Sequence, residues 1–186
     1  MEVMQAIKER RSIRKYKSAP VSDNNLMIVM EAGQSAPSWA NTQCWQFIVV
    51  QDAEKKRSIQ KILSPGNQSK LNLDIVPIVI AACVEHEKSG YRDGKVMTDK
   101  GNSWSMLDLG LALQNITLAA YSLGLGTLHV GMFDNSEVSR ILGVPENITV
   151  VELMLLGYPD EQPAARSRKA LSKIVHYDQY IPQQEE

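Results

Sequence analysis

The stretch Ser103–Gly131, SWSMLDLGLALQNITLAAYSLGLGTLHVG, decides which fold this chain can adopt. Apolar residues fall on every side of a helical wheel, so the pattern predicts a helix that is buried all round. Asp108 and Gln114 interrupt the run, which therefore falls short of the roughly 18 to 20 apolar residues of a membrane span. The helix should end at residues 124–126, because glycine accepts a left-handed backbone there. A short strand is expected at 127–131.

The rest of the chain predicts helices and strands interspersed around this stretch. Helices are expected at 2–9, 22–36, 52–63 and 134–142, and strands at 47–50, 75–84 and 149–157. Residues 37–43 form a turn-rich connector, and the charged, glycine-containing segment 86–101 is expected to be a surface excursion. The chain therefore predicts one domain over residues 1–186, of the layered α/β or α+β class with a mixed sheet flanked by helices. Residues 160–186 are expected to form an extended arm.

Composition excludes several classes of partner. The chain has 20 Lys and Arg against 21 Asp and Glu, a net charge of -1 that gives no overall field for nucleic acid or an anionic membrane. Cys44 and Cys83 lack the CxxC spacing, and the first residues open directly into a helical pattern without an apolar signal segment. These features predict a reduced, cytoplasmic protein.

Common catalytic motifs are missing from the sequence. Gly124-Leu125-Gly126 follows a helix and precedes a strand, which is the reverse of the dinucleotide-binding order, and no GxxxxGK[ST] or GxSxG occurs. His86, His129 and His176 show no ligand spacing among themselves or with the cysteines, so no metal site is expected. Neither cysteine has an adjacent histidine that would lower its pKa. Nucleophilic catalysis therefore has no candidate residue.

Polar groups at breaks in the chain remain as candidates. Arg10-Arg11-Ser12-Ile13-Arg14 carries guanidinium groups and a hydroxyl that could bind one phosphate, although a solvated basic turn would have the same composition. Asn67-Gln68-Ser69-Lys70 is rich in donors, and Arg166-Ser167-Arg168-Lys169 is again basic with a hydroxyl. None of these three segments is specific by itself.

Taken in order, these segments resemble the nitroreductase family of flavin enzymes over nearly the whole chain. Residues 10–14 are similar to the family's RxSxR/K segment, and residues 37–45, PSWANTQCW, to its PSxxNxQPW stretch. Asn67 and Lys70 match its NxxK pair, and residues 114–115, 118–120 and 123–127 match its core helix and the end of that helix. The resemblance implies the family's fold, which is a mixed, mainly antiparallel sheet flanked by helices around a long buried helix, in an intertwined dimer.

The resemblance also implies a cofactor and the residues that hold it. The cofactor is FMN, with its phosphate on Arg10, Arg11, Ser12, Arg14, Arg166 and Arg168, and with its ring near Pro37, Ser38, Trp39, Asn41, Asn67, Lys70, Val130 and Gly131. Residues 37–41 would lie against the flavin of the partner subunit. Lys70 and Arg14 are implied as tuners of the ring, since positive charge favours the reduced anion. No side chain beyond the flavin is needed for the redox step.

The implied activity is FMN-dependent reduction of a nitroaromatic, quinone or enone by NADH or NADPH in a ping-pong cycle, with the arm 160–186 packed on the partner of a homodimer. Two alternatives stay open: another flavin reaction on the same scaffold, such as dehalogenation, flavin fragmentation or ferredoxin-linked reduction, and a non-catalytic flavin-binding module. Cys44 stands where the family usually has proline, and His129 where relatives have an aromatic residue or proline. The acceptor, the choice of nucleotide, the role of Cys44 and the substrate contacts of the 86–101 excursion cannot be derived from the sequence.

Overall fold

A computed structural model describes residues 1–64, 66 and 73–182 and is built around one four-stranded sheet. The strands are β1 (Trp45–Val50), β2 (Ile78–Glu85), β5 (Gly126–Val130) and β6 (Ile148–Gly157), in the order β1-β2-β6-β5. All three pairings are antiparallel, and a parallel bridge joins Ser12 to Thr127 at the β5 edge. The predicted mixed, mainly antiparallel sheet is therefore confirmed.

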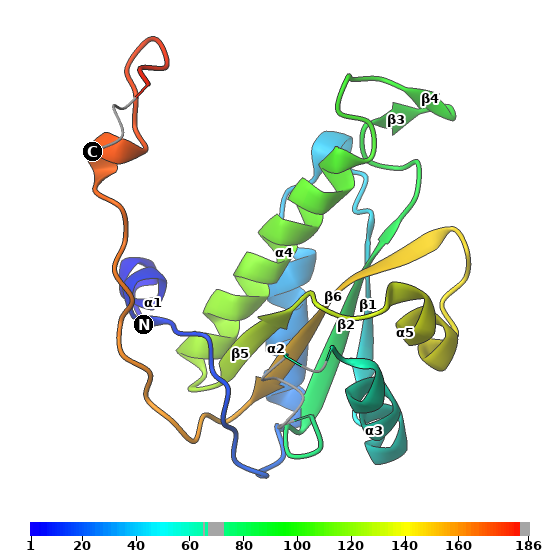
Figure 1. Ribbon diagram of the computed structural model, residues 1–186, viewed down its shortest axis with the longest axis vertical. Coiled ribbons are helices and arrows are strands. Elements are labelled where there is room, and N and C mark those ends of the chain that lie inside the picture. The colour runs from blue at the N-terminus through cyan, green and yellow to red at the C-terminus, as the bar shows by residue number, and fades with distance from the viewer. Residues whose placement is uncertain (65, 67–72, 183–186) are drawn as a thin grey trace.

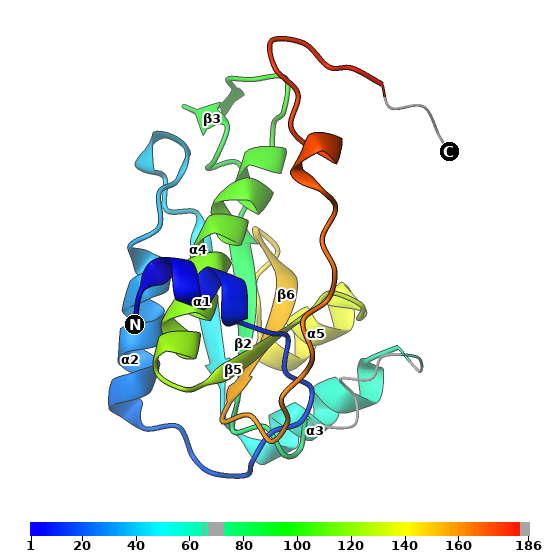
Figure 2. The same cartoon turned by 90° about the vertical axis from the view of Figure 1, so that its left-hand side faces the viewer.

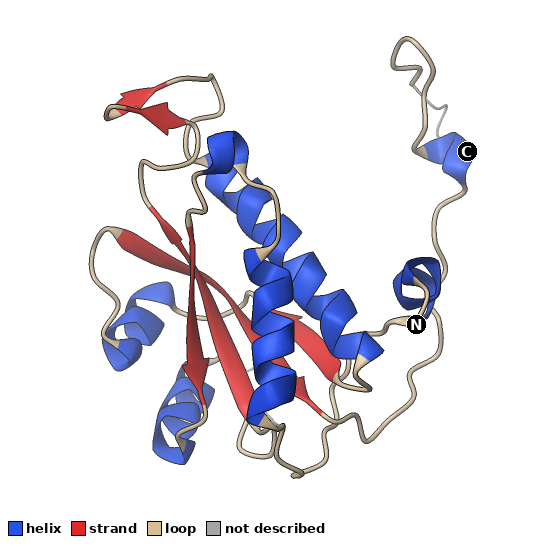
Figure 3. Cartoon of the chain, turned by 180° about the vertical axis from the view of Figure 1, so that it is seen from behind, coloured by secondary structure: helices blue, strands red, loops and turns tan. Residues whose placement is uncertain are grey.

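Helices cover both faces of the sheet (Figures 1 and 3). The first helical layer contains α2 (Asp23–Gln34) and α4 (Ser103–Ser122), and the second contains α3 (Ala53–Ile62) and α5 (Asn135–Leu142). Alternate side chains of the strands enter two buried clusters, one under each pair of helices, as the period of two in a strand requires. The short helix α1 (Val3–Glu9) lies across α4 (Figure 2).

Capping residues set the ends of these helices. The side chains of Ser22, Asp52 and Asp134 each accept a hydrogen bond from the backbone N–H three residues later, which satisfies a donor that has no partner inside the helix. Behind α4 the chain turns at Gly124, whose φ is +74°, as the glycine pattern predicted.

Helix α4 differs from the prediction of a helix buried all round. Leu109, Ala112 and Ile116 are at most 1% exposed, but Met106 and Leu107 are half exposed in the single chain. Leu111, one turn further on, is 39% exposed. An apolar pattern does not distinguish a face covered by its own domain from a face that remains open, which is why the sequence predicted full burial.

Two segments project from this core. The excursion 86–101 contains a small hairpin of β3 (Tyr91–Arg92) and β4 (Lys95–Val96), which sequence analysis missed because each strand has only two residues. After Pro159 the chain passes beside the N-terminal segment and then leaves the body as an extended arm, whose described part contains the 3₁₀ turn η3 (Leu171–Lys173) (Figure 1). The arm exposes large apolar side chains of Leu171, Ile174, Val175, Tyr177, Tyr180 and Ile181.

No helix in the described part of the chain is both long and apolar enough to cross a bilayer.

Glycine brings α2 and α4 into close contact. A Cβ atom at Gly33 would lie 2.8 Å from both Cδ1 and Cγ1 of Ile116, which is fully buried on α4. A hydrogen atom is thus the largest side chain that this crossing accepts without displacement. The crossing also sets where the chain leaves α2 for the connector at residue 37.

We predict that Gly33→Ala lowers the free energy of unfolding by about 1 to 3 kcal/mol, because the methyl group overpacks the helix crossing. In the Ile116→Ala background the same methyl group enters vacated space, and alanine should instead stabilise the chain by about 0.5 to 1 kcal/mol through its helix preference. Urea unfolding of the four chains at one protein concentration measures this cycle. Equal destabilisation by Gly33→Ala in both backgrounds would contradict the contact.

Candidate functional site

A basic cavity of about 690 Å³ lies between the N-terminal segment 7–14 and residues 163–168 of the arm. Six basic residues and no acidic residue of the described chain line it: Lys8, Arg10, Arg11, Arg14, Arg166 and Arg168, together with Ser12 and apolar or small residues. So many like charges around one hollow repel one another unless an anion lies among them. The five arginines and Ser12 are the six residues that the family resemblance assigned to a phosphate, and the structure brings all of them to this one cavity.

Backbone hydrogen bonds place the N-terminal wall of the basic cavity. The N–H of Ile13 donates to the carbonyl of Thr127 on β5, at 2.9 Å, and the N–H of Lys17 donates to the carbonyl of Tyr158, also at 2.9 Å. Where the arm begins, the N–H of Asp160 donates to the carbonyl of Lys15 at 2.9 Å. The start of the arm thus runs beside the basic segment, which explains how residues 150 positions apart share one cavity.

Glu161 fixes the same junction from the arm. Its carboxylate accepts hydrogen bonds from the backbone N–H groups of Arg14 and of Lys15, the latter at 3.1 Å. The neighbouring Tyr16 is buried, and burial, with a smaller contribution from Glu161, raises the pKa of its hydroxyl. Tyr16 is therefore a neutral packing residue, and Glu161 orients the backbone that carries Arg14.

The guanidinium groups in the wall are only partly satisfied by the protein. Arg11 donates from Nη1 to the carbonyls of Lys8 and Arg10, at 2.8 and 2.9 Å. The Nε atoms of Arg10 and Arg11 are buried and have no hydrogen-bond partner among the described residues. Buried donors of this kind normally have a partner, so an acceptor outside the protein, such as a phosphate oxygen, fits this wall.

A second hollow of about 340 Å³ adjoins the basic cavity and shares Arg10 and Arg11 with it. The C-terminal end of α4 contributes Thr117 and Tyr121 to its lining, and the Tyr121 hydroxyl donates to Glu9 at 3.1 Å. The two hollows together extend from the basic residues toward the edge of the sheet.

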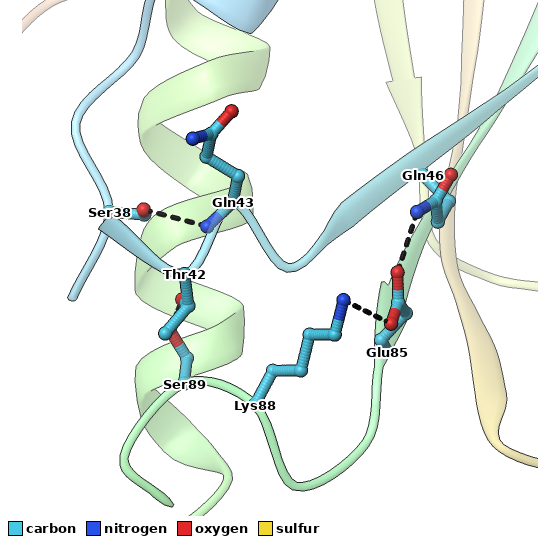
Figure 4. A network of polar contacts seen from close by, with 7 residues as sticks. All are labelled: Ser38, Thr42, Gln43, Gln46, Glu85, Lys88 and Ser89. Atoms are coloured by element: carbon cyan, nitrogen blue, oxygen red, sulfur yellow. Dashed lines mark hydrogen bonds and ion pairs between the residues drawn. The ribbon is translucent and has the colours of Figure 1, made fainter. Parts of the chain in front are cut away.

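The connector after α2 lies toward the opposite end of α4. It contains the short 3₁₀ turn η1 (Trp39–Asn41). Within the connector, Pro37 and Asn41 are exposed, and Ser38 and Trp39 are half-buried. The Ser38 hydroxyl accepts the N–H of Gln43 at 2.9 Å, as Figure 4 shows. Within one chain, these residues do not line the basic cavity. The connector contacts Asp108 near the N-terminal end of α4, whereas Tyr121 near the C-terminal end lines the adjoining hollow.

Val130 and Gly131 lie at the end of β5, the edge strand of the sheet. The Val130 side chain is buried, whereas a Cβ at Gly131 would meet nothing within 4 Å. His129, which precedes Val130, forms hydrogen bonds with the hydroxyl of Thr117, at 3.1 Å, and with the carboxylate of Glu152. Asn67 and Lys70 lie outside the described residues.

Two polar residues near these groups were not assigned a role from the sequence. Asp108 is 2% exposed inside α4, and a carboxylate inside an apolar helix was the signal that could have identified it. Glu161 offered no such signal, because an acidic residue in a polar tail is ordinary. Among the described residues, no group of three or more His, Cys, Asp or Glu side chains is arranged to hold a metal ion.

Comparison of the sequence with known proteins identifies relatives of this chain. The nitroreductase family model matches residues 7–158. The NADPH-flavin oxidoreductase of Vibrio harveyi is 31% identical over 181 residues, covering 95% of this chain and 74% of that protein. The FMN reductase [NAD(P)H] of Bacillus subtilis is 30% identical, covering 99% of this chain and 76% of that protein.

Solved structures agree with the sequence relatives. NADPH:FMN oxidoreductase from Vibrio harveyi, complexed with NAD+, superposes with a TM-score of 0.85 at 28% identity, over 98% of this chain and 79% of that chain. Nitroreductase A from Vibrio parahaemolyticus gives a TM-score of 0.86 at 29% identity, over 99% of this chain and 79% of that chain. With the fold, the ordered segments and the basic cavity in place, the chain belongs to the nitroreductase family.

Proposed function

We propose that this chain is an FMN-dependent oxidoreductase that uses NADH or NADPH to reduce a small acceptor such as a nitroaromatic, a quinone or an enone. The observation that carries the proposal is the basic cavity, in which six basic side chains from the N-terminal segment and the arm surround a hollow, and two buried Nε atoms have no partner among the described residues. FMN reduction with NAD(P)H is the activity named for the Bacillus subtilis relative.

The basic cavity suits the phosphate of FMN. A phosphate monoester carries between one and two negative charges at neutral pH and has several acceptor oxygens, which match convergent guanidinium groups. Arg10, Arg11, Ser12 and Arg14 would bind from the N-terminal segment, and Arg166 and Arg168 from the arm. The adjoining 340 Å³ hollow leads from this phosphate toward β5, where Val130 and Gly131 would lie along the ring.

The ring end of the site is incomplete in one chain, so we propose a homodimer. Pro37, Ser38, Trp39 and Asn41 lie across α4 from the chain's own basic cavity, and a partner copy would bring its own connector to the ring. The exposed apolar residues Met106, Leu107 and Leu111 on α4, and those of the arm, supply the surface that such a dimer would cover. Asn67 and Lys70 keep their proposed role at the ring, with Lys70 and Arg14 as tuners of its charge.

The protein residues would bind and orient, and the cofactor would supply the redox chemistry. FMN held by these residues would supply the redox chemistry, accepting a hydride from the nucleotide and returning two electrons, with protons, to the acceptor. Positive charge from Arg14 and Lys70 would favour the reduced anion. Both substrates would reach the ring from the same face. A single shared face gives the ping-pong order, because the oxidised nucleotide must leave before the acceptor enters. A cytoplasmic location, with its nucleotide supply, stays a prediction.

The phosphate assignment predicts that Arg10→Ala with Arg168→Ala raises the Kd for FMN at least about a hundredfold, since two charge-assisted hydrogen bonds are lost. Titration of the apoprotein followed by flavin fluorescence measures this value. The control double variant Arg57→Ala with Arg140→Ala removes two exposed guanidinium groups from α3 and α5 and should bind FMN normally. An unchanged Kd in the first variant would show that the phosphate binds elsewhere.

The proposed cycle predicts parallel double-reciprocal lines when initial rates with NADH or NADPH are measured at several concentrations of a quinone. Bound FMN that neither nucleotide reduces under anaerobic conditions, but that a reduced ferredoxin does reduce, would replace this proposal by a protein-linked flavin reaction. FMN that binds and is reduced by none of these donors would instead indicate a non-catalytic flavin-binding module.

A further inference from the structure

The carboxylate of Asp108 lies at the centre of a buried polar cluster that the proposed function does not use. Asp108 is 2% exposed, in the second turn of α4. Its two oxygens accept the backbone N–H of Trp39 at 3.0 and 3.1 Å, and Oδ2 also accepts the hydroxyl of Ser89. The Cys44 Sγ atom lies 3.9 Å from the same oxygen. These contacts join three segments of the chain, namely the connector, the excursion and α4 itself.

Two of those segments are the connector and the excursion. The Thr42 and Ser89 hydroxyls are 2.8 Å apart, and Glu85 accepts the Gln46 amide at 2.6 Å and pairs with Lys88 at 2.5 Å. Figure 4 shows these contacts side by side between the strand that follows the connector and the base of the excursion. Asp108 therefore binds the connector through Trp39 and the excursion through Ser89.

The connector needs such support, because its backbone is unfavourable by itself. Ala40, Asn41 and Gln43 have φ values of +46°, +56° and +47°, a region that side chains other than glycine rarely adopt. Conformations of this kind persist only where the surroundings hold them. The N–H of Trp39, immediately before this run, is the group held by both Asp108 oxygens.

The donors to Asp108 are neutral, and Asp108, Ser89 and Cys44 are all buried. Burial raises the pKa of the Cys44 thiol, with Asp108 adding a smaller contribution, so the sulfur is protonated and acts as a weak donor. A buried carboxylate satisfied by several directed donors fixes their mutual positions more strictly than apolar contacts do.

We propose that Asp108 is a positioning residue for the ring end of the flavin site: its carboxylate locks the connector 38–44 and the base of the excursion 86–101 in one arrangement. The inference rests on the proposed function, in which the connector of one copy contacts the ring bound by the other. On this proposal, the geometry of the ring face that meets the acceptor depends on Asp108, which touches neither FMN nor the acceptor.

The variant Asp108→Asn tests this role. Both oxygens of Asp108 lie within 3.1 Å of the Trp39 nitrogen, so an amide group in either orientation places an N–H donor against another donor. Ser89→Ala removes one hydroxyl and leaves the Trp39 contacts intact. Asp99→Asn is the matched control, because Asp99 is 85% exposed in the excursion and pairs only with its neighbour Lys100 in the contacts that the structure gives.

Two measurements are made on each chain. Amide hydrogen exchange of the apoprotein should rise at least about tenfold in peptides 38–44 and 86–92 of Asp108→Asn, mainly in 86–92 of Ser89→Ala, and in neither for Asp99→Asn. With FMN bound, Asp108→Asn should change the visible circular dichroism of the flavin and raise the acceptor KM about tenfold to a hundredfold, with kcat reduced far less.

Several results overturn the inference. Exchange in Asp108→Asn equal to that in Asp99→Asn shows that the carboxylate does not hold the two segments. Faster exchange with unchanged flavin dichroism and unchanged acceptor KM shows a purely structural role. If Asp108→Asn does not fold, the test is made with Ser89→Ala. Amide exchange and an acceptor KM equal to those of the wild type in Ser89→Ala would then show that the cluster does not couple the excursion to the flavin site. A wild-type chain that binds no FMN rejects the proposed function and this inference with it, whereas the first two results leave FMN binding in place.

Discussion

Electrostatic repulsion among six basic side chains around one cavity is the constraint on which the rest of this structure depends. Like charges this close favour an open arrangement unless the backbone holds them or an anion neutralises them. The backbone holds them through the parallel bridge at Ser12, the return of the arm at Asp160 and the carboxylate of Glu161. The positive charge that remains without a counter-charge is the reason to propose the cavity as an anion-binding site.

Helix α4 is the scaffold that relates this cavity to the other polar groups. Its C-terminal end contributes Thr117 and Tyr121 beside the cavity, and its second turn carries Asp108 under the connector. Close packing against α2 at Gly33 keeps the helix in place on the sheet. Twenty residues of helix span about 30 Å, so one chain keeps its phosphate-binding and connector groups apart. The proposed dimer resolves this separation, because a second copy can bring its connector to the first copy's cavity.

Local patterns predicted much of the fold. The helix at 103–122, the glycine turn behind it and the capped start at Asp134 follow from side-chain periodicity and backbone preference, which are properties of neighbouring residues. The exposed face of α4 could not be predicted, because the same apolar residues suit an interior or an interface. The hairpin of β3 and β4 was missed because two residues give no periodicity.

For the candidate site residues, too, local sequence patterns were not enough, because their roles depend on contacts between distant parts of the chain. Arg10 and Arg168 could be placed in one cavity only through the family resemblance, since no local rule joins residues so far apart in sequence. Asp108 and Glu161 act through contacts with distant backbone N–H groups, so their roles became visible only in three dimensions. The residue that looked like an interruption of the apolar helix is thus the one that ties three segments together.

A crystal structure of this chain with FMN tests the central claim most directly. The account predicts a phosphate within hydrogen-bond distance of Arg10, Arg11 and Arg168 in the basic cavity, and a ring that meets Ser38 or Asn41 of a second copy. A phosphate bound outside the basic cavity, or a ring enclosed by one chain alone, would contradict it.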